Sequence, residues 1–196
     1  MPTLAEQFGQ IDIYLFDQLL RGRIAPGMRI LDAGCGYGRN LVYLLREGYE
    51  VFGVDREHDA VEHLRGVGNS ENFRIEPVEA MSFPNAFADV VISSAVLHFA
   101  HDDPHFAAML ESCWRVLKPG GLFFCRLASS IGIESQVQPL GNRRFRLPDG
   151  SDRYLVDEAI LMGWTHQLHG ELLDPLKTSV VQNQRSMTTR VLRKVQ

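Results

Sequence analysis

The chain has 196 residues, of which 45% are hydrophobic and 22% charged, a composition that predicts one globular domain with a full core. Its 20 basic and 24 acidic residues leave a formal net charge of −4, which excludes an overall positive field that would attract nucleic acid or an anionic membrane. No run of about 18 apolar residues occurs and the N-terminal segment lacks a leader pattern, so we expect a cytoplasmic protein without a membrane partner.

Extended and helical patterns alternate along the first two thirds of the chain. A helical pattern within residues 12–24 comes first. The β-rich runs that follow are residues 28–33, 50–55, 73–78, 88–94 and 121–128, and the helical patterns between them are residues 39–48, 59–68 and 104–121. This alternation predicts a parallel sheet with helices on both faces.

The alternation of extended and helical patterns stops after Ala128. Residues 143–156 are typical of an exposed hairpin, and a short helix is expected at 157–162. Two strands within residues 172–195 are separated by only a few residues, so they must pair antiparallel.

The chain is predicted to be a single domain, residues 1–196. Within it, residues 1–27 form an N-terminal helical lid, and residues 129–156 form an insertion over the sheet.

The three cysteines, Cys35, Cys113 and Cys125, have no CxxC spacing. Their odd number and their positions in predicted core or glycine loop do not suit a disulfide or zinc framework. They fit a reducing compartment.

The sequence "ILDAGCGYGRN", residues 30–40, lies where the first predicted strand turns into a helix. Ligands of open α/β sheets bind at this carboxyl edge, and Gly34, Gly36 and Gly38 leave the main chain bare there. A dinucleotide fingerprint would need glycine at the position of Arg39, and no Gly-Lys-Ser/Thr sequence follows. The spacing therefore favours neither NAD nor a nucleoside triphosphate.

This loop resembles the first cofactor motif of the class I S-adenosylmethionine (SAM) dependent methyltransferases. "VFGVD", "FADVVISSAVLHF", "LKPGG" and the closing antiparallel pair continue the resemblance from about residue 28 to the end. "GYGRN" and "MTTRVLRK" are similar to the tellurite-resistance and thiol methyltransferase-like branch. The resemblance implies an α/β fold with three layers, in which a Rossmann-like, doubly wound, seven-stranded sheet is mostly parallel with a C-terminal antiparallel strand.

The resemblance also implies SAM as cofactor and S-adenosylhomocysteine (SAH) as its product. Asp32 is expected near the amino end of the methionine moiety, above the glycine bed, and Asp55 is expected to accept hydrogen bonds from both ribose hydroxyls. A helix N-cap is the structural alternative for Asp55. The implied cofactor-binding set is Asp32, Ala33, Gly34, Cys35, Gly36, Gly38, Asp55, Arg56, Glu79, Ala80, Met81 and Ser94.

Adenine recognition departs from the family pattern. The family commonly has an acidic residue where this chain has Pro77. Glu79, two residues on, is a substitute, or the backbone alone reads the base. Met81 either lies against the adenine ring or fills the core.

Methyl transfer from a sulfonium needs an aligned acceptor more than it needs catalytic side chains. The resemblance places His98 near the reacting methyl group, where three roles stay open: a general base, a residue that lines the site, or a satisfied buried histidine. His98, His101, Asp103 and His105 also raise the possibility of a metal, but they span a strand end, a loop and a helix start. Capping by Asp102 and Asp103 is the better interpretation, so no metal is predicted.

Substrate choice is expected to depend on the N-terminal segment and the insertion, where five arginines face three acidic residues between 126 and 153. This surplus either attracts an anionic acceptor or belongs to a solvated hairpin. The predicted function is SAM-dependent methyl transfer to a small molecule by a monomer or homodimer.

Three alternatives remain. A nucleic-acid methyltransferase is disfavoured by the acidic chain and by "SSAV" in the fourth-strand motif. A SAM-binding or SAH-binding regulatory protein would keep the cofactor bed without transfer. An NAD(P)-dependent oxidoreductase is kept because Arg56 follows Asp55 and could contact a ribose phosphate.

Overall fold

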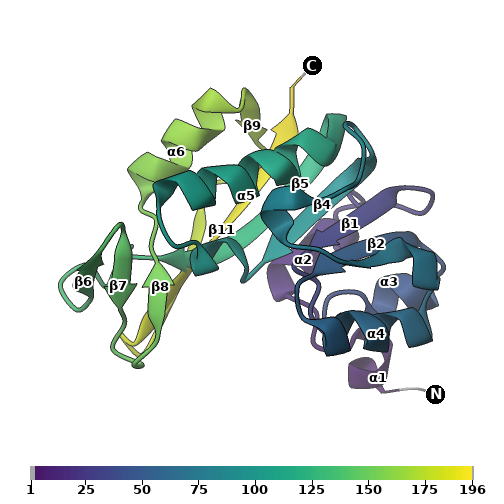
Figure 1. The fold of residues 1–196 in the computed structure, drawn as a ribbon, viewed down its shortest axis with the longest axis horizontal. Coiled ribbons are helices and arrows are strands. Elements are labelled where there is room, and N and C mark those ends of the chain that lie inside the picture. Colours follow the sequence, from purple (N-terminus) through teal and green to yellow (C-terminus); the bar gives the residue numbers. More distant parts are fainter. Residues whose placement is uncertain (1–2, 196) are drawn as a thin grey trace.

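Residues 3–195 are described by the computed structural model, in which a twisted sheet of eight strands carries helices on both faces (Figure 1). Strands β1 to β5 pair parallel with one another, and β9, β10 and β11 join antiparallel. The spatial order is β10-β11-β5-β4-β1-β2-β3, with β9 also beside β11. The strands are β1 (Arg29–Ala33), β2 (Glu50–Asp55), β3 (Phe73–Ile75), β4 (Ala88–Ser94), β5 (Leu117–Ser129), β9 (Gly170–Leu172), β10 (Lys177–Val181) and β11 (Arg185–Lys194).

The predicted α/β class, the parallel strands and the closing antiparallel pair are confirmed. The sheet has one strand more than the seven implied by the resemblance, because the short β9 pairs with the end of β11. The helices are α1 (Leu4–Phe8), α2 (Ile13–Leu20), α3 (Val42–Arg46), α4 (His58–Val67), α5 (Asp103–Val116) and α6 (Glu158–Gln167), with single 3₁₀ turns η1 (Ser70–Asn72), η2 (Val78–Ala80) and η3 (Leu97–Phe99). Among these described helices, none is long and apolar enough to cross a bilayer.

Two hydrophobic cores form because successive side chains of a strand point to opposite faces of the sheet. In β5, Phe124 belongs to the core that contains Leu44 of α3 and Leu64 of α4. Its neighbour Phe123 belongs to the core that contains Leu110 of α5. The nearly continuous apolar strands are therefore buried on both faces, as parallel strands are.

Some element boundaries differ from those expected. The helix expected through residue 121 ends at Val116, and "LKPGG" already belongs to β5. Leu117 already pairs with Ala88 of β4, and the register of the β4–β5 pair shifts between Ala88 and Val90. The start of this stretch is therefore part of the sheet. The helix that the sequence pattern closes at Gly66 continues to Val67, with Gly68 as its C-cap.

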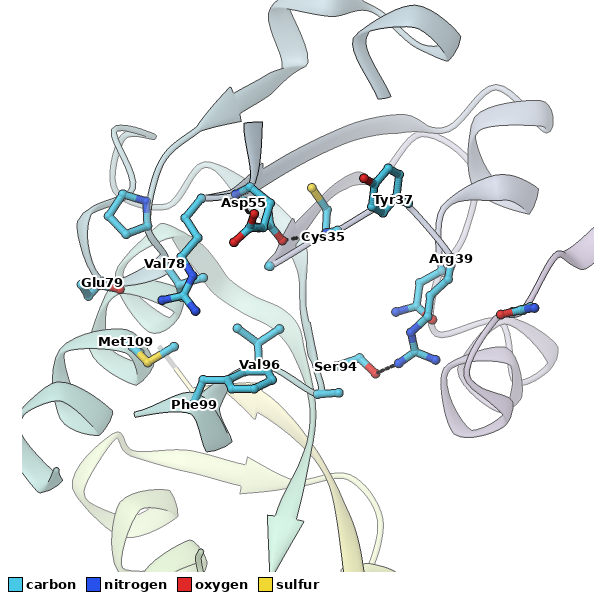
Figure 2. A pocket seen from close by; sticks show the side chains of 18 of the residues that line it. Cys35, Tyr37, Arg39, Asp55, Val78, Glu79, Ser94, Val96, Phe99 and Met109 are labelled. Carbon is cyan, nitrogen blue, oxygen red and sulfur yellow. Dashed lines mark hydrogen bonds between the residues drawn. The ribbon is translucent and has the colours of Figure 1, made fainter. Parts of the chain in front are cut away.

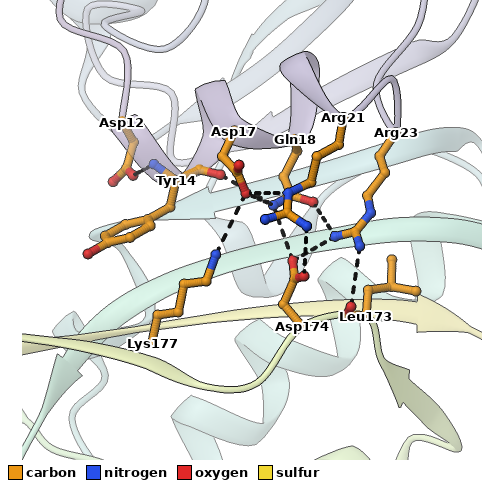
Figure 3. A network of polar contacts seen from close by, with 9 residues as sticks. All are labelled: Asp12, Tyr14, Asp17, Gln18, Arg21, Arg23, Leu173, Asp174 and Lys177. Atoms are coloured by element: carbon orange, nitrogen blue, oxygen red, sulfur yellow. Dashed lines mark hydrogen bonds and ion pairs between the residues drawn. The ribbon is translucent and has the colours of Figure 1, made fainter.

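The N-terminal segment is attached to the far end of the chain by a polar network around Asp174 (Figure 3). Arg23 and Gln18 both donate to Asp174 Oδ2, at 2.6 and 3.3 Å, and Asp17 lies 3.6 Å from Lys177. Although burial opposes it, the hydrogen bond from Arg23 lowers the pKa of Asp174. Helix α2 is thus tied to the β9–β10 connection, and residues 1 and 2 of the predicted lid lie outside the described residues.

The predicted insertion contains a separate three-stranded antiparallel sheet, made of β6 (Gln138–Gly141), β7 (Arg144–Arg146) and β8 (Asp152–Tyr154). The expected hairpin is its β7–β8 pair. The small sheet projects from one end of the molecule beyond β11 and α6, away from β1 to β3 (Figure 1).

Candidate functional site

A cavity of about 770 Å³ opens at the carboxyl ends of β1, β2 and β4, where an open α/β sheet binds ligands (Figure 2). All the residues that line it come from positions 9 to 109. The lining includes Gly34, Cys35, Gly36, Asp55, Arg56, Glu79 and Ser94 of the expected cofactor set. It also includes residues that the sequence reasoning did not single out as cavity lining: Gly9, Gln10, Tyr37, Arg39, Asn40, Val42, Glu57, Pro77, Val78, Ala95, Val96, Phe99, His105 and Met109.

The three loop glycines do different jobs, although all have positive φ. A Cβ on Gly36 would meet no atom within 4 Å, so only Gly36 leaves its Cα side open to a ligand. A Cβ on Gly34 would lie 2.4 Å from Val96, and one on Gly38 would lie 2.5 Å from Leu64. Gly38 is buried and absent from the cavity lining, so it serves the packing of the loop against α4.

Asp55, at the end of β2, fastens the loop. Its Oδ2 accepts a hydrogen bond from the Gly36 N–H at 2.8 Å, and its Oδ1 accepts from the Glu57 N–H at 3.0 Å. Helix α4 has Glu57 as its N-cap, with no side-chain capping bond, so the N-cap alternative for Asp55 is wrong. Each carboxylate oxygen keeps a second lone pair for a ligand.

Asp32 is buried in β1 beneath the loop and does not line the cavity. Its Oδ1 has no hydrogen-bond partner. Burial raises the pKa of Asp32 to about 8, against the opposing charge of Arg39. A positively charged ligand group nearby would favour the ionised carboxylate.

A further part of the cavity wall is formed by η2, η3 and α5. Val78 and Met109 supply apolar surface, and Glu79 Oε1 lies 3.5 Å from His105 Nε2 across the end of the cavity. Of the neighbours expected to contact adenine, Ala80 is exposed outside the lining and Met81 is buried in the core. The core interpretation of Met81 therefore fits the structure, and Met109 of α5 occupies the apolar role.

The carboxyl end of β4 brings Ser94 and Ala95 to the cavity. The Ser94 hydroxyl accepts a hydrogen bond from Arg39 Nη2 at 2.8 Å. Ala95 has a φ of +65°, an unfavourable conformation for a residue with a Cβ. Its N–H donates to the Arg126 carbonyl at 2.7 Å, which holds this strained turn against β5.

His98 lies in η3, buried and outside the cavity lining. Its Nδ1 accepts a hydrogen bond from the Ala128 N–H at 3.0 Å. Burial, together with the charges of Arg153 and Arg126, lowers the pKa of His98 to about 3. This environment fits the satisfied buried histidine among the three roles considered.

The neighbouring histidines do not assemble a metal site. No group of three or more His, Cys, Asp or Glu side chains gathers anywhere within residues 3–195. Asp102 caps α5 by accepting from the His105 N–H at 2.8 Å, as expected. Asp103 instead accepts from the Tyr154 hydroxyl at 2.8 Å, so it ties α5 to β8.

No residue of the 129–156 insertion lines the cavity. The insertion therefore does not form part of the cavity wall in this structure, and its expected part in substrate choice stays a prediction. Its strands pair with one another, and Tyr154 and Val156 join the main core on the α5 side of the sheet. The guanidinium of Arg153 lies 4.9 Å from the ring centroid of Phe99, which lines the cavity. Ala33 is buried in the sheet, not in the cavity wall.

The fold and its glycine loop define a Rossmann-like α/β protein with a ligand cavity at the first strand. A protein family described as a methyltransferase domain matches residues 31–125 of this chain. A probable SAM-dependent methyltransferase from Mycolicibacterium smegmatis is 29% identical over 150 residues, which cover 73% of this chain and 56% of that protein. A ubiquinone biosynthesis O-methyltransferase from Methylocella silvestris is 36% identical over 114 residues, which cover 54% of this chain and 43% of that protein. The chain spans about half the length of these relatives.

Solved structures share the fold over nearly the whole chain. A SAM-dependent methyltransferase from Methanosarcina mazei superposes with a TM-score of 0.74 at 20% identity, covering 90% of this chain and 97% of that one. A Burkholderia thailandensis 1,6-didemethyltoxoflavin N1-methyltransferase, crystallised with that compound and SAH, gives 0.70 at 21% identity and coverages of 91% and 76%. TehB from Haemophilus influenzae gives 0.69 at 20% identity and coverages of 94% and 62%. The matched methyltransferase domain, the relatives and these neighbours show that this chain is similar to SAM-dependent methyltransferases in sequence and in fold.

Proposed function

We propose that this chain transfers a methyl group from SAM to a small-molecule acceptor and releases SAH. The observation that carries the proposal is the cavity itself, in which the open Cα face of Gly36 adjoins the carboxylate of Asp55. Bare backbone beside a carboxylate at a strand end suits a nucleoside with two free ribose hydroxyls.

The surrounding residues fit the other parts of SAM. Asp32 supplies an unpartnered buried oxygen beneath the loop, and the cationic sulfonium and amino groups would favour its ionised form. Val78 and Met109 provide apolar faces for the adenine, and we infer that Glu79 accepts from its amino group in place of the acid that Pro77 replaces. Arg56 and Cys35 complete the wall near the sugar.

SAM supplies an activated methyl group, whose bond to sulfur breaks as the bond to the acceptor forms. The protein's contribution is then to align the acceptor and exclude water. Such positioning can lower the activation free energy by roughly 7–11 kcal/mol. The cavity wall does this with rigid strand ends. His98 has no assigned step, because its Nδ1 accepts from the backbone and its side chain is buried away from the cavity.

A small acceptor is supported by the cavity and by the relatives. Tyr37, Val42 and Phe99 line the cavity with exposed apolar surface, which suits an organic acceptor better than a polyanion. One relative is named for ubiquinone biosynthesis, and one neighbour was crystallised with the small molecule 1,6-didemethyltoxoflavin. The resemblance of "GYGRN" and "MTTRVLRK" to the tellurite-resistance and thiol methyltransferase-like branch keeps thiols and metalloids among the acceptors to test.

Calorimetric titration with SAM and SAH tests the cofactor, and a radiolabelled methyl assay over thiols, phenols, amines, carboxylates and metalloid oxyanions tests transfer. We expect micromolar binding that falls at least about tenfold in Asp55→Ala, which removes the two acceptor oxygens for the ribose. Glu47→Ala, an exposed change on the same sheet face, is the control. Absence of cofactor binding would refute the proposal, and binding without any methylated product would favour a SAM-binding or SAH-binding regulatory protein.

A further inference from the structure

Arg39 brings a positive charge to the cavity wall and forms no direct ion pair with a carboxylate of the described residues. It lines the cavity directly after the glycine loop, and within residues 3–195 no Asp or Glu oxygen lies within 4.0 Å of its guanidinium. Its one hydrogen bond goes to the Ser94 hydroxyl. A guanidinium has five N–H donors and stays charged at all relevant pH, so most of its donors remain for a ligand.

A buried carboxylate behind Ser94 holds this arrangement in place. Ser94 Oγ donates to Asp12 Oδ2 at 3.4 Å, and Arg126 Nη1 lies 3.3 Å from the same oxygen. Asp12 Oδ1 accepts from the Tyr14 N–H. Because the charge of Asp12 is already balanced by Arg126, it orients the serine without neutralising Arg39.

The backbone of Asp12 adds a second tie, since its N–H donates to Asn40 Oδ1 at 3.0 Å. Asn40 follows Arg39 in the chain and also lines the cavity. The N-terminal segment, the glycine loop and β4 therefore meet at one point, and Arg39 and Ser94 lie there on the opposite side of the cavity from Asp55 (Figure 2).

The strand order decides which part of SAM reaches Arg39. β1 lies between β2, which ends in Asp55, and β4, which ends in Ser94. A ligand whose sugar lies at Asp55 and whose chain crosses the bare Gly36 must end at β4. The far end of SAM is an α-amino acid, and planar, bidentate pairing with a carboxylate is what a guanidinium does best.

We propose that Arg39 and Ser94 form the subsite for the α-carboxylate of the cofactor, with Asp12 as the residue that positions them. This inference rests on the proposed function, because it assumes that SAM is the ligand. It predicts that the contribution of Arg39 is confined to ligands that possess the amino-acid moiety.

The test compares SAH with 5′-methylthioadenosine, which keeps the nucleoside and the thioether but lacks the amino acid. For Arg39→Gln we expect SAH affinity to fall roughly 10- to 100-fold, while methylthioadenosine affinity stays within about twofold. Arg56→Gln, which removes a second cavity-wall arginine on the sugar side, is the matched control and should leave the ratio of the two affinities unchanged. Asp12→Asn should lower the affinity for SAH, relative to that for methylthioadenosine, by about three- to tenfold. A loss of stability alone would lower both affinities and leave their ratio unchanged.

Unchanged SAH affinity in Arg39→Gln, or an equal loss for both ligands, would overturn the inference. In either case the wild-type protein still binds SAH, so neither result contradicts the proposed function. Failure of the wild-type protein to bind either ligand would refute the proposed function and this subsite together.

Discussion

The two sides of the cavity are built in different ways. On the side of Asp55, the glycine loop and the end of β2 are separated by 19 residues and joined by one hydrogen bond from the Gly36 N–H. On the side of Arg39, partners come from positions 12, 94 and 126, so their separations reach 114 residues. The first side depends on a local backbone shape, whereas the second depends on the whole fold being in place. Damage to each side should therefore have different consequences.

The largest expected effect comes from filling the open face of Gly36. Gly36→Val would place a β-branched side chain in the cavity, and we expect SAH affinity to fall at least about 100-fold, or roughly 3 kcal/mol. Gly22→Val is the matched control, because Gly22 has a φ of +68° with open space around it and lies outside the cavity lining. Calorimetry and thermal unfolding of both variants separate binding from backbone strain. Wild-type affinity in Gly36→Val would contradict the assigned role of the loop.

Asp32→Asn tests the buried carboxyl beneath the loop. Because burial raises the pKa of Asp32 in the folded state to about 8, unfolding releases its proton between about pH 4 and pH 8. The contribution of the protonated Asp32 carboxyl to the free energy of unfolding is fully present below about pH 4. It is lost as the pH rises to about 8. The melting temperature of Asp32→Asn, relative to that of the wild type, should therefore rise with pH and be several degrees higher at pH 8 than at pH 4. A stability difference of about 1 kcal/mol shifts the melting temperature by roughly 2–4 °C. Parallel curves for the two proteins would contradict this.

A smaller effect of opposite sign is expected at His98. Burial lowers its pKa to about 3, so the unfolded chain takes up a proton that the folded state cannot, and stability is lost as the pH falls from about 6.5 towards 3. At pH 5 this loss amounts to about 2 kcal/mol. His98→Gln can still accept from the Ala128 N–H, and chemical unfolding at pH 5 and pH 7.5 should show a smaller difference than in the wild type. An equal difference would show that His98 is protonated in the folded protein.

The smallest effect is expected at an exposed ion pair of the three-stranded sheet, none of whose residues lines the cavity. Arg146 donates to both oxygens of Asp152, at 2.7 and 3.0 Å, and the pair is exposed. An exposed ion pair contributes little to stability because solvent screens it, so Arg146→Ala should leave the melting temperature and the SAH affinity nearly unchanged. A measurable loss of affinity would show that this sheet reaches the site after all.

Much of the local structure was predictable from the sequence. Apolar runs of strand length, glycine at positions 34, 36 and 38, and the short spacing of the last two strands led to the parallel sheet, the loop and the antiparallel end. Gly36 was expected in the site because it follows the first predicted strand, and Asp55 because the resemblance implied a ribose-binding carboxylate at the end of the second. The "GYGRN" segment contained Arg39, but nothing near it in the chain indicated what it would contact.

The remaining parts were decided in three dimensions. Met81 follows the 3₁₀ turn η2 and Met109 lies within α5, yet of these two methionines only Met109 lines the cavity. His98 and His105 are seven residues apart, yet the cavity includes His105 alone. The insertion carried the charges that suggested a substrate mouth, but none of its residues lines the cavity.

The amino-acid sequence by itself determined the order of strands and helices, the bare loop and the carboxylate after the second strand, because these depend on side-chain periodicity and on backbone freedom within a few residues. Only the tertiary structure decided that Asp12, Ser94 and Arg126 meet at Arg39, that Asp32 keeps an unpartnered oxygen, and that His98 turns to the backbone of Ala128. These contacts arise from packing two layers of helices on a twisted sheet, and such packing joins residues whose separation in the chain carries no local signal.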